Sequence, residues 1–330
     1  MRTILLVVLA AVATLIMQRY VGGETIYAPE LAARRDTAHQ LLLTNQLPPG
    51  RTWSSYGLKG ASARPATIYL AEGIHSALGV SLRKTYFLID TLALFASLLG
   101  LFAFLRLFVS PAIAAYGLLY FCLVLPLTYA LHLFHPWDRL SVLFWIAALY
   151  CLRLNRLAAF ALLLVAGILV KYDMVLLPGL YFLVAIRKQN VARTALITCG
   201  LFLLAFATYA WLSAHFGAGV GPRNQVLKRI LINLDYLRTE LLFYPPLLAF
   251  ALPVLLAMIG WRSADHFARV AAAFAGILAI PLFLATNFAE VRAEVPLLVL
   301  ILPAALTGLR SVIPAEREPP RSATASPPPW

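Results

Sequence analysis

Two residues with acid–base chemistry lie one helical turn apart in the polar segment that follows the first apolar run of the chain. They are Asp36 and His39. A carboxylate in an exposed loop can accept the proton of a hydroxyl nucleophile, and an imidazole can orient a phosphate or bind a metal. An ordinary solvated helix can carry the same pair. Glu24 and Glu30, which lie closer to the apolar run, compete for the role of base or metal ligand.

A second group of charges interrupts a long apolar stretch between residues 157 and 185. Lys171 and Asp173 flank Tyr172 there. A charge at the centre of a bilayer costs about 2.5–3.5 kcal/mol, so these side chains must face a polar cavity, pair with each other or mark a surface turn. A lysine in a cavity can hold a phosphate as a point charge. A hairpin turn with a local ion pair explains the pattern equally well.

Two further charged turns follow the same pattern. Asp138 and Arg139 come directly after Trp137, and Glu290 and Arg292 lie between the last two apolar stretches. Arginine can clamp a phosphate or a carboxylate with two parallel hydrogen bonds. Asp138 can also cap the helix that follows it. Each turn taken alone is explained as a solvated connection between helices.

The elements that must position these residues are membrane helices. Apolar residues make up 62% of the chain and charged residues 12%, with a mean hydropathy of +0.82. A soluble domain has about 25% charged residues. In lipid, each span must satisfy its own backbone hydrogen bonds, so an all-α bundle is expected. The net charge of +13 is explained by basic loops and the anionic lipid surface, and nucleic acid is not an expected partner.

We predict about ten spans in one transmembrane domain, residues 1–313. The predicted spans cover residues 3–20, 86–108, 111–133, 139–153, 157–170, 174–187, 194–214, 245–260, 267–286 and 294–310. Amphipathic helices are expected over residues 29–43 and 66–78 of the long loop 21–85, and over 225–244. The Pro- and Ser-rich segment 314–330 is expected to be a disordered tail.

The distribution of basic residues predicts the orientation of the spans. Short Lys/Arg clusters fall on one side, which the positive-inside rule assigns to the cytoplasm together with both termini. The opposite, external face then receives loop 21–85 and all three charged turns. The sequence therefore predicts a working site at one outer surface, built from distant parts of the chain.

At this point the chain resembles GT-C-type glycosyltransferases, the multispanning class that uses polyprenyl-phosphate-linked sugars. Asp36 and His39 lie in a segment that resembles the loop helix bearing the catalytic acid of that class. The other similar segments are residues 64–69 before the second span, the glycine–apolar–lysine–apolar–proline segment 167–178, and the acidic–basic turn 290–296. The chain would be a compact member that lacks a soluble periplasmic domain.

The resemblance implies sugar transfer from an isoprenoid-phosphate donor to a glycan or lipid acceptor, at the outer face of the bacterial inner membrane. Asp36 would be the general base, with Glu24 or Glu30 sharing an acid or metal role; a divalent ion would fit, although no ligand spacing indicates one. The residues implied to bind substrate or its phosphate are His39, Lys171, Asp173, Asp138, Arg139, Glu290 and Arg292. The alternatives are a transporter or flippase for an anionic or lipid-linked solute, and a non-catalytic subunit of an envelope-polysaccharide assembly.

Overall fold

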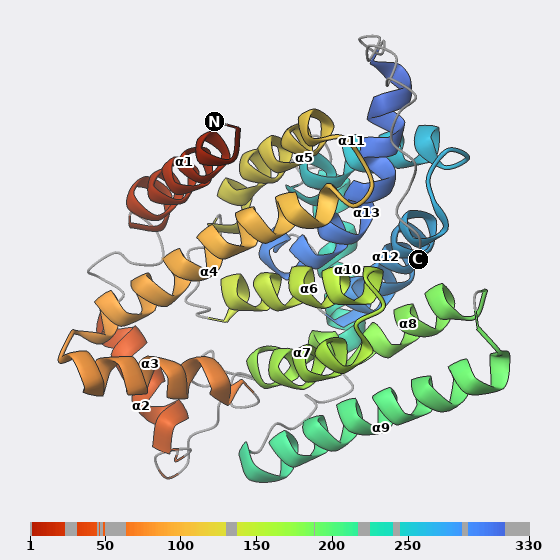
Figure 1. The fold of residues 1–330 in the computed structure, drawn as a ribbon. Helices are drawn as coiled ribbons and strands as arrows, with labels where there is room; N and C mark the ends of the chain where they lie inside the picture. Colours follow the sequence, from red (N-terminus) through yellow and green to blue (C-terminus); the bar gives the residue numbers. More distant parts are fainter. Residues whose placement is uncertain are drawn as a thin grey trace.

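A computed structural model describes residues 2–23, 32–44, 46, 49, 64–129, 137–187, 189–216, 225–239, 245–285 and 290–313. Every element in these ranges is helical, as the composition predicts. The helices lie side by side in a bundle, and α4, α6, α7 and α9 run across the view of Figure 1. The apolar helices are α1 (Arg2–Ile16) with a π-helical turn (Met17–Gly22), α4 (Leu82–Leu105), α5 (Pro111–Val124) with a 3₁₀ turn (Leu125–Tyr129), α6 (Asp138–Arg153), α7 (Leu157–Val170), α8 (Leu177–Ala185) preceded by a 3₁₀ turn (Tyr172–Leu176), α9 (Val191–Phe216), α11 (Pro245–Gly260), α12 (His266–Ala285) and α13 (Val291–Val312).

Each predicted span corresponds to one of these helices, but the predicted number of about ten crossings is not established. Within the described ranges, six helical segments are long and apolar enough to cross a membrane, starting at Leu5, Leu82, Pro111, Val191, His266 and Val291. Three shorter apolar helical segments cover Leu157–Val170, Tyr172–Ala185 and Pro245–Gly260. A 14-residue helix is only about 21 Å long, less than the roughly 30 Å hydrocarbon layer. The architecture indicates a helical multi-pass membrane protein.

Helix α13 forms the centre of the bundle. In the apolar stretch of α13 that could cross a membrane, 72% of the residues are buried, compared with 22% in the corresponding stretch of α9 at the periphery. It packs most closely against α11, where Gly260 and Gly308 bring the two backbones together. A Cβ atom at Gly308 would lie 1.9 Å from the carbonyl oxygen of Leu256. This close approach fixes α13 against α11, and α13 also contacts α6.

The predicted amphipathic helices exist as helices. They are α2 (Ala32–Thr44), α3 (Pro65–Leu78) and α10 (Gln225–Thr239). Helix α2 packs on α3, and α3 on α4 and α7. Helix α10 lies against α12, where the Asn233 side-chain amide donates to the Phe283 carbonyl at 2.7 Å. Because that carbonyl is in the last turn of α12, the bond satisfies an acceptor that the helix itself leaves open.

The antiparallel pair α6 and α7 defines the two ends of the bundle. Helix α6 runs from Asp138 to Arg153, and α7 returns from Leu157 to Val170, next to Lys171. We refer to the Asp138 end and to the Arg156 end, where α6 turns into α7. Helices α2 and α3 lie at the Asp138 end (Figure 1).

Candidate functional site

The Asp138 carboxylate is the centre of a buried group of ion pairs. The Lys171 Nζ atom lies 3.3 Å from its Oδ1 atom, and the Arg292 Nη1 atom donates to its Oδ2 atom at 2.8 Å. Asp138 begins α6, Lys171 follows α7, and Arg292 is in the first turn of α13. Three segments that are distant in sequence therefore bring one anion and two cations together.

Two further carboxylates surround these cations. Asp173 lies 3.3 Å from the Lys171 Nζ atom and accepts a hydrogen bond from the Trp145 indole at 3.3 Å. Glu290 pairs with the Arg292 guanidinium. The Asp138 cluster, defined as Asp138, Lys171, Asp173, Glu290 and Arg292, thus contains three carboxylates against two cations. Buried charges require such partners, because desolvating an ion without a counter-ion is costly.

Arg64 adds a cation beside the Asp138 cluster. Its guanidinium carbon lies 4.6 Å from the ring centroid of Trp137 and 5.2 Å from that of Tyr172. Stacking of this kind holds a guanidinium through cation–π attraction. Arg64 directly precedes α3, so it connects the long loop with the charged turns before α6 and after α7. No role was predicted for Arg64 from the sequence, because the sequence does not indicate which aromatic rings a loop arginine will contact.

Arg139 takes part in a different network from its neighbour Asp138. It donates to the Thr128 hydroxyl through Nη2 and to the Tyr129 hydroxyl through Nε. Tyr129 in turn donates to Gln18, and the Gln18 amide donates to Asp90 at 3.0 Å. Consecutive residues on a helix point about 100° apart, which separates the two side chains. The sequence predicted Arg139 as a substrate contact and missed the buried Gln18 and Asp90.

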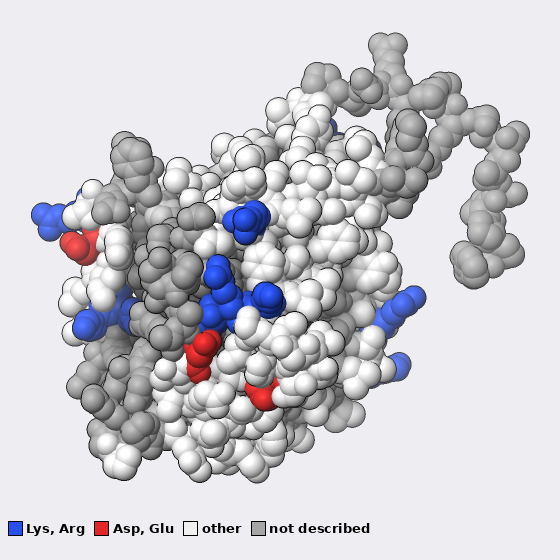
Figure 2. Space-filling view, turned by 90° about the vertical axis from the view of Figure 1, so that its left-hand side faces the viewer, with Lys and Arg blue, Asp and Glu red and all other residues white. Residues whose placement is uncertain are grey.

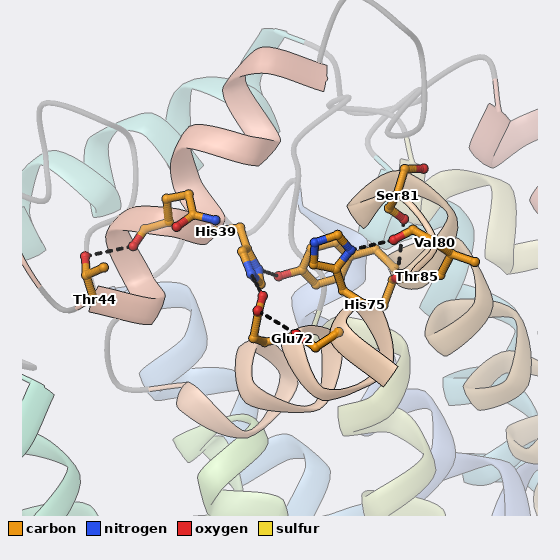
Figure 3. Close-up of polar contacts among 10 residues, drawn as sticks. His39, Thr44, Glu72, His75, Val80, Ser81 and Thr85 are labelled. Carbon is orange, nitrogen blue, oxygen red and sulfur yellow. Dashed lines mark hydrogen bonds and ion pairs between the residues drawn. The ribbon is translucent and has the colours of Figure 1, made fainter. Parts of the chain in front are cut away.

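Figure 3 shows His39 enclosed between α3 and the start of α4. Its Nε2 atom lies 2.9 Å from the Glu72 carboxylate and its Nδ1 atom 2.7 Å from the Tyr86 hydroxyl. A neutral ring with its proton on Nε2 fits both contacts, because Tyr86 then donates to Nδ1. The hydrogen bond from His39, followed by one from Ser76, lowers the pKa of Glu72 below its usual 4.5. His39 is therefore fully engaged in holding α2 against α3.

Asp36 differs from His39 in its surroundings although both lie on α2. Its side chain is 52% exposed and pairs with Arg35 at 3.4 Å. Within the described residues, Asp36 forms no ion pair with Lys171 or Arg292. The structure therefore leaves Asp36 accessible and does not gather it into the Asp138 cluster. Glu24 and Glu30 lie outside the described residues.

Glu294 is a buried acid that sequence reasoning did not include among the site residues. Its side chain is 0% exposed, and neither carboxyl oxygen has a hydrogen-bond partner in the described part of the chain. It lies one helical turn after Glu290 on α13. The sequence shows that Glu294 is an acidic residue near the start of an apolar helix. Its burial could not be predicted, because it depends on the surrounding helices.

Figure 2 shows the face of the molecule at the Asp138 end, where basic and acidic side chains gather near its centre. Among the residues that the structure describes, no three His, Cys, Asp or Glu side chains are placed to hold a metal ion. The arrangement can bind an anion through Lys171 and Arg292 if the anion replaces part of their carboxylate contacts. No family model, curated protein or solved structure matches this chain.

Proposed function

We propose that this protein is a membrane glycosyltransferase that moves a sugar from an isoprenoid-phosphate donor to a glycan or lipid acceptor. The supporting observation is the convergence of Lys171 and Arg292 on Asp138. In this proposal the Asp138 end lies at the external face of a bacterial inner membrane, and both termini are cytoplasmic. This orientation is supported by α2, α3 and the three charged turns, which were all predicted to be external and which lie at the same end of the bundle.

The proposed chemistry requires positive charge at the donor phosphate. When the sugar departs, negative charge grows on the phosphate oxygens, and fixed cations stabilise that charge more than the ground state. Lys171 supplies a point charge and Arg292 a planar pair of donors. Asp138, Asp173 and Glu290 hold both cations in place before the donor binds. Arg139 is not assigned to the phosphate, because it is buried and donates to the Thr128 and Tyr129 hydroxyls.

The acceptor requires a base, and we assign this role to Asp36. Its exposed carboxylate is accessible to a hydroxyl group, whereas His39 is enclosed by Glu72 and Tyr86. A base must reach the proton that it removes within about 3 Å in the substrate complex, although sites without substrate are often looser. Glu24 or Glu30 would share the acid or metal role if a divalent ion takes part.

The test is sugar transfer by purified protein in lipid vesicles, with polyprenyl-phosphate-linked sugars as donors. Lys171→Met and Arg292→Leu should each reduce transfer by about 10²–10³-fold, the usual effect of removing one transition-state donor. Lys84→Met and Arg83→Leu are matched controls, because both residues are exposed on the first turn of α4. Equal transfer by a site variant and its control would contradict the assignment.

Transport of an anionic or lipid-linked solute is the second candidate. It is favoured by Asp90, which is 3% exposed and lies inside the candidate span Leu82–Leu105. Ionisable residues inside spans often mark substrate or proton pathways. Movement of the lipid-linked donor across vesicles, without a new glycosidic product, would favour transport. Absence of both activities, together with co-purification of a partner, would favour a non-catalytic subunit.

A further inference from the structure

A polar cavity lies at the Arg156 end of the bundle. It has a volume of about 190 Å³ and is formed where α6, α7, α8 and α9 meet. This volume is below the roughly 300–1,000 Å³ of pockets for drug-sized ligands, so it suits a small headgroup. Its lining residues are Leu152, Asn155, Arg156, Leu157, Tyr181, Gln189, Arg193 and Ile197.

The charge of this cavity is not neutralised. Arg156 and Arg193 line it, no acidic residue does, and neither arginine has a carboxylate partner in the described ranges. The carboxylate of Asp265, which lies at the same end of the bundle, is paired with Arg153 at 2.6 Å. Two guanidinium groups therefore face the cavity with their donors available for an anion.

The local backbone places these two arginines firmly. Asn155 adopts a left-handed conformation with φ of 57°, which asparagine tolerates better than most residues, and this allows α6 to turn into α7 within a few residues. The Asn190 side chain accepts the Ala192 backbone N–H at 2.9 Å and caps the first turn of α9, which contains Arg193. Tyr181 is buried and stacks on Phe160, which fixes the inner wall of the cavity.

The surroundings favour a lipid as the source of the anion. Ile197 lines the cavity from α9, and the neighbouring Leu196 and Leu203 on the same helix are among the most exposed large apolar side chains. In a membrane protein such a surface contacts acyl chains. Basic pockets between helices are known to hold the headgroups of anionic lipids. We propose that this cavity binds the phosphate of an anionic phospholipid, with Arg156 and Arg193 as its ligands.

The experiment measures thermal unfolding of the purified full chain in neutral detergent while phosphatidylglycerol is added. We expect the unfolding midpoint to rise with phosphatidylglycerol and not with phosphatidylcholine. The double variant Arg156→Gln/Arg193→Gln should need about tenfold or more lipid for the same rise, since partly exposed charge contacts contribute modestly. Arg187→Gln/Arg262→Gln removes the same charge from exposed positions outside the cavity and should behave like the wild type.

Soluble glycerol 3-phosphate distinguishes the two sources of the phosphate group. A rise with phosphatidylglycerol alone supports a lipid ligand, whereas an equal rise with glycerol 3-phosphate supports the same site with a free solute as its ligand. A double variant that responds at the wild-type lipid concentration overturns the proposal. If that variant does not fold, Arg156→Gln and Arg193→Gln are tested singly, and wild-type responses in both would overturn it.

Discussion

The two ends of the α6–α7 pair differ in whether their basic side chains are paired with carboxylates. At the Asp138 end, Lys171 is buried and Arg292 is only 13% exposed, and each contacts two carboxylates. At the Arg156 end, Arg156 and Arg193 are exposed at a cavity without an acidic lining residue. The difference shows that burial, and not the number of basic residues, decides which cations need internal partners. A buried cation needs counter-ions or hydrogen-bond partners within the fold, whereas an exposed one can bind a ligand or remain in water.

This difference between the two ends is tested most directly by substituting Asp138. Asp138→Asn should lower the free energy of unfolding by about 3–5 kcal/mol, because Lys171 and Arg292 would lose a shared buried counter-ion. The control is Asp265→Asn, which breaks the more exposed Arg153–Asp265 pair and should cost less than about 1 kcal/mol. Denaturant unfolding of both variants in detergent gives the two values. Equal losses would mean that the Asp138 cluster is solvated like the surface pair.

A second variant, at Asp36, tests catalytic activity at the same end of the molecule. Asp36→Asn should reduce sugar transfer by about 10²–10⁴-fold if its carboxylate is the general base. Its unfolding midpoint should fall modestly, because Asp36 is half exposed but is the carboxylate that pairs with the buried Arg35 in the described part of the chain. Transfer is measured with a polyprenyl-phosphate donor. Unchanged transfer by folded Asp36→Asn would remove Asp36 from the mechanism.

The smallest expected effect concerns the attachment of α2 to α3. The pKa of Glu72 is lowered in the folded protein by its hydrogen bond with His39, so the carboxylate stabilises the fold above the ordinary value of 4.5. That contribution should be lost as the pH falls through the lowered pKa of Glu72. The protection of the α2 backbone amides, measured against their intrinsic exchange rates at each pH, should therefore fall in this acidic range. Glu72→Gln should exchange faster at neutral pH and lose the Glu72-dependent step.

The helical elements could be predicted from the sequence because their signals are local. Apolar runs bounded by Pro and charged residues gave helices at α4, α5, α9 and α13, and the amphipathic pattern gave α10. The number of crossings could not be predicted in this way, because short apolar helices such as α7 and α11 are compatible with either spanning or partly buried positions. Length and composition do not decide between these positions.

For the candidate site, too, local properties of single residues could be predicted from the sequence, whereas contacts between helices could not. From the sequence we could predict that the charge at Lys171 requires polar surroundings within an apolar chain, and that Asp138 lies either in a solvated turn or at the start of a helix. The packing of the helices shows that Asp138, Lys171 and Arg292 meet, that Arg139 turns towards Tyr129, and that Glu294 is enclosed. The physical reason is that helix periodicity fixes the direction of a side chain relative to its own helix. Its partners depend on how helices pack, and close backbone contacts such as Gly260–Gly308 establish that packing.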